Sequence, residues 1–402
     1  MIFQLIEYIK NFLRYIGEML ALLNSMGIYY IPNYNNILEF PKDYNINDDL
    51  KIINDNEKLY IEIVKFVLDN EYFKNGIIIS LSGGVDSMVV LRLLIETRKI
   101  KFFDIYAVMI NYNLREESVE EAKFIEEYCN KNDIKLTVTH IDNFSDRKNL
   151  GSSKRKEFED ISKEKRFSSY QKIIDEKGAV GVIFGHHKDD IIENIFTNML
   201  KGHNLLDIEV MKHKNVIKGV TVFRPLLNYY KSDIFDFAHK YQIPYFKDTT
   251  PSWSRRGQMR NLIFPLLSSV FGDSWKHKLK EIGNQSNLLF DTVNENLINP
   301  WIDIVNFDNL SSNKKFVFEL PIRHRDDICL WYYTIPKLFY MKGYNCIKKK
   351  SIEKLFDIAN TQKSNPGKIY TLDKGFTASK IDEKICIFYD NSNLEKSFIY
   401  EK

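Results

Sequence analysis

The sequence predicts an α/β protein whose core is a doubly wound, mostly parallel sheet. Two observations support this fold class. From Gly76 onward, short apolar runs alternate with amphipathic helical patterns, as they do in parallel sheets covered by helices on both faces. In addition, a loop of glycine, serine and aspartate at residues 82–87 separates the first apolar run from the first of these helices. We expect a helical extension before this sheet domain and a smaller α+β region after it.

The elements of the sheet domain follow one another in a regular order. Each apolar run is short and rich in β-branched residues, which favours a buried strand, and helical spacing follows each run. Ligands of such sheets bind at the carboxyl ends of the strands, so we expect the functional residues in the turns that follow the strands. The expected strands are 77–81, 105–112, 135–141, 179–185 and 216–223, and the expected helices are 85–97, 118–131, 157–177, 189–201 and 231–241.

Two regions, 1–70 and 271–402, flank the sheet domain, which we place at 71–270. Residues 1–23 carry apolar positions at helical spacing with charged residues between them, which predicts an amphipathic helix and not a membrane span. Residues 271–402 are expected to form an accessory region that binds RNA. The other expected helices are 58–70, 272–298, 327–341 and 351–361, and the expected antiparallel strands of the tail are 367–372, 376–381 and 384–390.

Composition excludes several classes of protein. A chain of 402 residues that is 44% hydrophobic can bury a full core in two or three domains. Its formal charge of +3 is too small for a protein that coats nucleic acid along its length, so any such contact is a local patch. The four cysteines form no CxxC pair, which argues against a zinc framework or a sulfur carrier. With no secretory pattern at the start, we expect a cytoplasmic protein without membrane contact.

The loop Ser82–Ser87, with the sequence SGGVDS, carries the most chemical information. Gly83 and Gly84 let backbone N–H groups turn toward a phosphate, and the helix that begins near Val85 adds partial positive charge. The two serines can donate hydroxyl groups to the same phosphates, and Asp86 is suited to hold either Mg²⁺ or the loop itself. No lysine follows the glycines, so this is not the GxxxxGK[ST] loop of kinases and GTPases.

The loop resembles the SGGxDS loop of the ATP pyrophosphatases, and later segments resemble one class of these enzymes, the tRNA(Ile)-lysidine synthetase family. Together the similar segments cover residues 76–270 in that family's order, with Tyr112, Lys163 and Asn194 as departures from its usual residues. The segments are INYNLREES (110–118), EDISKEKRFSSYQ (159–171), GHHKDDIIENIFTNMLKG (185–202), RPLLNYYKSDIFDFAHKYQIPYFKDTT (224–250) and SRRGQMRNLIFPLL (254–267).

The resemblance implies an adenine nucleotide alpha hydrolase-like fold and a ligase that uses ATP, Mg²⁺ and L-lysine to modify a wobble cytidine in a tRNA anticodon loop. It implies that Asp86, Asp190 and Glu193 take part in the chemistry, the last two by positioning and deprotonating the lysine ammonium. It assigns ATP binding to Ser82–Ser87 with Asn111, Arg115 and His186. It assigns the acceptor side to Arg166, His187, Arg224, Asp248, Arg256, Arg260 and Asn261.

The residues alone leave plainer alternatives open. Asp189 and Asp190 would also serve to cap a helix, and His186 and His187 would also suit a metal, although no further ligand cluster accompanies them. Rival functions are a tRNA thiolase, another amide ligase with this loop, and a homologue that binds tRNA without turnover. Whether the protein forms a homodimer is also left open.

Overall fold

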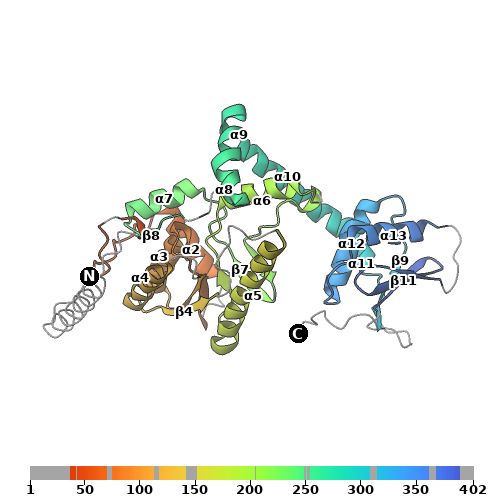
Figure 1. Ribbon diagram of the computed structural model, residues 1–402, viewed down its shortest axis with the longest axis horizontal. Coiled ribbons are helices and arrows are strands. Elements are labelled where there is room, and N and C mark those ends of the chain that lie inside the picture. The colour runs from red at the N-terminus through yellow and green to blue at the C-terminus, as the bar shows by residue number, and fades with distance from the viewer. Residues whose placement is uncertain are drawn as a thin grey trace, which may run out of the picture. The chain divides into compact units, whose positions relative to one another are not determined.

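The computed structural model describes the chain from Ile37 to Tyr389 (Figure 1). The helix expected at residues 1–23 lies outside this range. Of the described residues, those within Met1–Gly202 and Glu209–Glu281 form one compact unit, called unit 1, and those within His203–Ile208 and Ile282–Lys402 form unit 2. The description omits residues 42, 70–74, 113–116, 142–151, 204, 249, 251–253, 308–314 and 362–367.

Unit 1 is built on a six-stranded sheet, which confirms the predicted fold class. All neighbouring strands pair in parallel except the last two, which are antiparallel. The sequence analysis expected one strand over 216–223, and this expectation is wrong: the stretch is a hairpin, because Lys218 and Gly219 turn the chain with φ of 50° and 80°. In order across the sheet the strands are β4 (Lys135–His140), β3 (Ile105–Asn111), β2 (Ile77–Ser80), β5 (Val182–Ile183), β7 (Val220–Phe223) and β6 (Lys214–Ile217).

Helices cover both faces of this sheet. Ile77 and Ile79 of β2 are buried in one core with residues of α3 (Val85–Ile100) and α4 (Glu117–Lys131). Ile78, between them, belongs to a second core with Phe167 and Tyr170 of α5 (Ser152–Lys177). This alternation is the two-residue period of a strand buried on both sides, which is why the apolar runs are continuous.

The order of the strands reverses between β2 and β5. From β2 the chain adds β3 and β4 on one side, then crosses to add β5 and β7 on the other. The carboxyl ends of β2 and β5 therefore lie side by side at the switch point, where sheets of this kind bind ligands. One of these ends leads into the loop 82–87 and α3, and the other into α6 (Lys188–Leu200).

Residues 37–69 pack into the same core as the sheet. β1 (Leu38–Phe40) pairs antiparallel with β8 (Tyr245–Phe246), and α2 (Lys58–Asp69) contributes buried residues such as Ile63 and Val67. After β7 the chain forms α7 (Lys231–Lys240), which packs against α3. Unit 1 then continues through α8 (Arg255–Gln258), the π-helical turn η3 (Met259–Ile263), α9 (Phe264–Phe271) and the first part of α10 (Trp275–Val293).

Unit 2 contains the small antiparallel sheet predicted for the tail, together with a strand that the sequence analysis did not predict, β9 (Lys315–Pro321). Its core holds Trp301 and Trp331, whose ring centroids lie 5.2 Å apart. None of the helices in the described residues of either unit is long and apolar enough to cross a membrane. The remaining elements are η2 (Leu205–Asp207), η4 (Asn294–Ile298), α11 (Asn299–Ile302), α12 (Ile328–Met341), α13 (Lys349–Asn360), β10 (Ile369–Thr371), β11 (Phe376–Ile381) and β12 (Lys384–Tyr389).

Candidate functional site

The loop 82–87 is a tight turn with its own hydrogen bonds. Gly83 has φ of 76°, and a Cβ on it would lie 2.1 Å from the ring of Phe246, so only glycine fits. The Ser87 hydroxyl donates to the Gly84 carbonyl at 2.9 Å and accepts from the Ser82 N–H at 3.2 Å. Gly84 precedes α3, and no side chain among the described residues caps the helix there. The turn therefore presents an uncapped helix N-terminus, as a phosphate site requires.

Asp86, in the first turn of α3, has two differently engaged carboxylate oxygens. Oδ2 accepts a hydrogen bond from the Lys231 ammonium at 2.5 Å. Oδ1 is buried and has no hydrogen-bond partner among the described residues. No group of three or more His, Cys, Asp or Glu in the described part of the chain could hold a metal ion.

His187 links the loop to the acidic helix α6. Its ring Nε2 lies 3.8 Å from Asp86 Oδ1 and 3.4 Å from Asp190 Oδ2. Its backbone N–H donates to Asp190 Oδ2 at 3.0 Å, so Asp190 caps the start of α6. Only 2% of His187 is exposed. His187 is therefore a buried side chain that lies between the carboxylates of Asp86 and Asp190.

His186 is held by Arg224. The Arg224 Nε donates to His186 Nδ1 at 3.0 Å, and the same guanidinium donates to the Lys212 carbonyl and to Asn215 Oδ1 at 2.9 and 2.7 Å. Burial lowers the pKa of His186 to about 4, so the imidazole is neutral at physiological pH. Because Arg224 is only 4% exposed, the geometry favours a role in orienting His186 over direct contact with RNA.

The carboxylates of Asp190 and Glu193 lie on α6 and are 5% and 6% exposed. Arg256 donates its Nε to Glu193 Oε2 at 2.7 Å and another N–H to Asp190. Arg260 also contacts both carboxylates, Glu193 through its Nε and Asp190 at 3.3 Å. Burial alone would raise the pKa of Asp190, but His187 and Arg256 bring it below its ordinary value. Two carboxylates and two guanidinium groups thus form one closed network.

Asp189 joins three helices. Its Oδ2 accepts from the Lys231 backbone N–H of α7 at 2.9 Å, and its Oδ1 accepts from the Lys276 ammonium of α10 at 3.0 Å. Asp189 thus contributes to the tertiary structure, while Asp190 caps α6. The sequence did not point to Lys231 or Lys276 as residues of this site. Lys231 lies within the similar segment 224–250 but matches none of the residues that carry the resemblance, and both lysines reach the site only through the tertiary fold.

Two further predicted residues lie at the end of β3 and on α5. Asn111 is buried and donates to the Ser118 carbonyl at 3.2 Å. Arg166 donates to the hydroxyl of Tyr112 at 2.7 Å, so the tyrosine at this position is a partner for the predicted arginine. Arg115 lies outside the described residues.

The remaining predicted residues are more exposed. Asp248 has a side chain that is 72% exposed, and its carboxylate lies 4.0 Å from Arg260. Asn261 is exposed, and among the described residues it forms no hydrogen bond with Asp190 or Glu193. The fold therefore brings Asp86, His187, Asp190, Glu193, Arg256 and Arg260 together, and leaves Asn261 at the surface.

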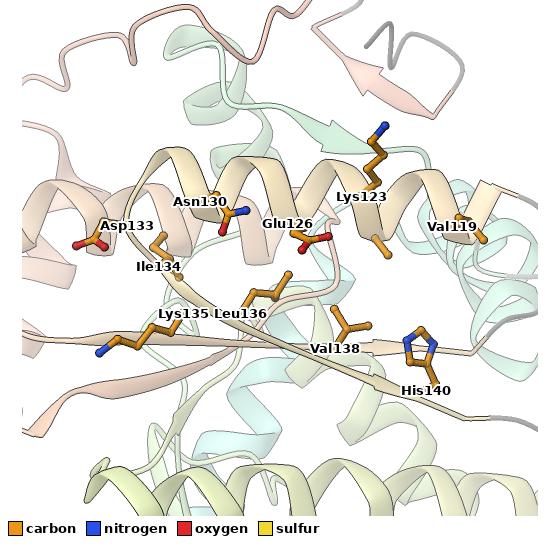
Figure 2. Close-up of a pocket in the computed structure, with 11 residues that line it drawn as sticks. Val119, Lys123, Glu126, Asn130, Asp133, Ile134, Lys135, Leu136, Val138 and His140 are labelled. Atoms are coloured by element: carbon orange, nitrogen blue, oxygen red, sulfur yellow. The ribbon is translucent and has the colours of Figure 1, made fainter. Parts of the chain in front are cut away.

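A groove of about 690 Å³ lies elsewhere, between α4 and β4 at the edge of the sheet. Figure 2 shows Leu136 and Val138 of the strand pointing toward the helix that carries Glu126 and Asn130. None of the predicted site residues that the structure describes lines this groove. The candidate site is thus defined by the polar network at the switch point and not by this groove.

Comparison with known proteins gives matches to the same part of the chain. A PP-loop domain family matches residues 56–267, which is more than half of the 402 residues. A tRNA(Ile)-lysidine synthase of Chlamydia muridarum is 30% identical over 220 residues, which are 53% of this chain and 64% of that protein. A tRNA(Ile)-lysidine synthase of Enterococcus faecalis is 28% identical over 193 residues, 48% of this chain and 40% of that protein. The chain thus spans less than two thirds of either relative.

A solved structure of a U34-tRNA thiolase from Methanococcus maripaludis aligns with 60% of this chain and 78% of its own, with 18% identity and a TM-score of 0.44. That score is too low to support an argument about function. The family match is different in kind, because it covers the loop 82–87, α6 and the arginines of α8 and η3 in a single span. The chain belongs to the PP-loop family of ATP-binding domains.

Proposed function

We propose that this protein is a ligase of the tRNA(Ile)-lysidine synthase type, which joins the amine of L-lysine to the wobble cytidine of a tRNA and releases AMP and pyrophosphate from ATP. One observation carries the proposal: a buried carboxylate pair that suits a substrate ammonium stands beside the phosphate loop. His187 connects them, 3.8 Å from Asp86 and 3.4 Å from Asp190. The choice of lysine as the amine and of tRNA as the acceptor follows the relatives, which are named tRNA(Ile)-lysidine synthases.

The loop 82–87 supports the ATP half of the reaction. Its backbone N–H groups and the start of α3 are positioned for phosphate, and the hydroxyls of Ser82 and Ser87 lie 3.2 Å apart beside them. Asp86 is the residue that would hold Mg²⁺, through the oxygen that has no protein partner among the described residues. When bound, this ion neutralises phosphate charge. The residues present therefore fit both ATP and Mg²⁺.

The carboxylate pair supports the lysine half of the reaction. Asp190 and Glu193 together carry two negative charges, and the lowered pKa of Asp190 keeps it ionised, as the binding of an ammonium requires. Both carboxylates already accept hydrogen bonds from Arg256 and Arg260. Lysine can therefore bind only where a guanidinium gives way. The side chains of these arginines are 48% and 28% exposed, so RNA phosphates can reach them and compete for them.

The thiolase alternative is not favoured. A thiolase needs a sulfur carrier, and the sequence of unit 1 contains a single cysteine, Cys129. This residue is fully buried on α4, and burial raises the pKa of its thiol to about 12. A thiol of this kind is protonated and inert at physiological pH.

A homodimer in the cytoplasm is part of the same proposal. Four large apolar side chains of η3 and α9, namely Leu262, Leu266, Val270 and Phe271, are each more than 60% exposed. A row of apolar side chains on one helix favours a protein partner, and a second copy is the simplest one. Sedimentation should show a dimer for the natural protein and a monomer for Leu266→Glu. A natural protein that sediments as a monomer at micromolar concentration would contradict this part.

The experiment that tests the main proposal combines the protein with labelled ATP, Mg²⁺, lysine and a transcribed tRNA with a CAU anticodon. AMP release and nucleoside mass are read together. The proposal expects AMP formation that needs both tRNA and lysine, with a mass gain on cytidine that equals lysine minus water. Glu193→Gln should abolish lysine transfer, whereas Glu164→Gln, on an exposed residue of α5, should not.

Each of the other two possible results of this experiment supports a rival function. AMP release without lysine dependence assigns another acceptor or donor to the same loop. Binding of tRNA with no turnover of ATP identifies a homologue that only binds RNA.

A further inference from the structure

The loop 82–87 lacks a basic residue of its own, although the ligand proposed for it, ATP, is a polyphosphate. The next cation along the chain is Arg92, and it is 1% exposed and paired with Glu96 and with the Lys51 carbonyl. It therefore cannot reach the loop. Backbone N–H groups and a helix terminus supply only partial charge, whereas ATP carries several full negative charges. Apart from a bound Mg²⁺, a full positive charge at this loop must come from a side chain elsewhere in the fold.

The fold supplies this charge through Lys231, which lies 144 residues beyond the end of the loop. Its Nζ lies 2.5 Å from Asp86 Oδ2. Its backbone is fixed in two ways: its own N–H donates to Asp189 at 2.9 Å, and the preceding N–H, that of Tyr230, donates to Asp233 at 2.8 Å. The start of α7 is thus anchored to α6 and capped by its own first turn, which aims this side chain at the loop.

The Lys231 ammonium can serve a phosphate as well as Asp86. An ammonium has three N–H donors, and Asp86 uses one of them. The side chain is 30% exposed, so a ligand in the loop can approach it. The other basic side chains near Asp86 are less suited: Arg256 is held by two buried carboxylates and His187 is enclosed.

We propose that Lys231 is the phosphate-binding cation of this PP-loop and contacts the pyrophosphate portion of ATP, which the loop sequence cannot neutralise by itself. Before ATP binds, Asp86 holds the ammonium in place. This inference rests on ATP binding by the PP-loop and not on the identity of the acceptor or the amine. The alternative is that the pair of Lys231 and Asp86 only fastens α7 to α3.

The test compares binding of three ligands by calorimetry, in the presence of Mg²⁺ and without RNA or lysine. The ligands are ATP, inorganic pyrophosphate and AMP. Lys231→Gln should weaken pyrophosphate and ATP by about tenfold or more, which corresponds to one ionic hydrogen bond, and AMP by less than about twofold. Lys231→Arg should restore most of the pyrophosphate affinity, because it keeps the charge.

Lys240→Gln is the matched control, because this lysine lies on the same helix and also forms an ion pair, with Glu57. It should change none of the three affinities. The proposal is overturned if Lys231→Gln leaves pyrophosphate binding intact, or if all three ligands weaken alike and Lys231→Arg fails to restore pyrophosphate binding. A natural protein that binds no ATP would overturn nucleotide binding itself. Loss of lysine transfer alone would concern only the proposed acceptor chemistry.

Discussion

Substitution of Arg256 and Arg260 measures how much unfolding free energy the protein loses when the buried carboxylates of α6 have no partner. In the natural protein Asp190 and Glu193 are 5% and 6% exposed, and each contacts both arginines. Breaking a fully buried ion pair by removing one partner costs about 3–5 kcal/mol, and breaking an exposed pair costs about 0–1 kcal/mol.

The cost of removing these arginines should lie between the two limits, because their side chains are 48% and 28% exposed while the carboxylates are enclosed. Arg256→Gln should therefore cost about 1 kcal/mol, since Arg260 still contacts both carboxylates. The double variant Arg256→Gln/Arg260→Gln should cost about 3–4 kcal/mol, more than twice the single change.

The double variant should also respond differently to pH. In the natural protein the pKa of Asp190 is below its ordinary value, so this carboxylate stabilises the fold at all pH values above its unfolded pKa of about 4. Without the arginines, burial raises the pKa of a carboxyl group, and protonation relieves the penalty as the pH falls. The difference in unfolding free energy between the two proteins should therefore shrink between pH 7 and pH 5.

Urea unfolding followed by tryptophan fluorescence measures this difference at both pH values. Arg255→Gln is the control, because Arg255 is an exposed neighbour, and the ion pairs of the two carboxylates within the described residues are with Arg256 and Arg260. An additive double variant, or a destabilisation that is the same at pH 7 and pH 5, would refute the reasoning. The double variant should also bind lysine without RNA more tightly than the natural protein, as equilibrium dialysis can show.

Three further predictions concern other parts of the molecule. Gly83→Ala should destabilise unit 1 by about 2 kcal/mol or more in urea unfolding, because of the positive φ and the ring of Phe246, while Gly84→Ala should cost less than about 1 kcal/mol. The pKa of His186, about 4, is below its unfolded value, so stability should fall by about 2 kcal/mol from pH 7 to pH 5, and His186→Gln should flatten this dependence. Lys380 is 7% exposed and donates to two carbonyls at the end of α13, so Lys380→Met should destabilise unit 2 by about 2 kcal/mol and leave ATP binding, measured by calorimetry, unchanged.

The main elements of unit 1 could be predicted because their signals are local. The helix over Val85–Ile100 follows a glycine turn, and its apolar residues recur at helical spacing, so both its start and its type are encoded within a few residues. Short elements were harder. A strand was predicted at 179–185, but only Val182 and Ile183 of this stretch form β5. The turn at Lys218 and Gly219 lies inside an otherwise largely apolar stretch, which conceals the hairpin.

The chemistry of the site divides in a similar way. The sequence by itself determined the phosphate loop, because Gly83 and its neighbours are contiguous, and the spacing of Asp190 and Glu193 on one face of a helix. Only the tertiary structure decided which basic side chains pair with the acidic residues of the site. Lys231 reaches Asp86, and Arg256 and Arg260 neutralise the carboxylates, through contacts between segments far apart in the chain. Such pairings depend on how helices pack around the switch point of the sheet, and no local pattern of residues encodes them.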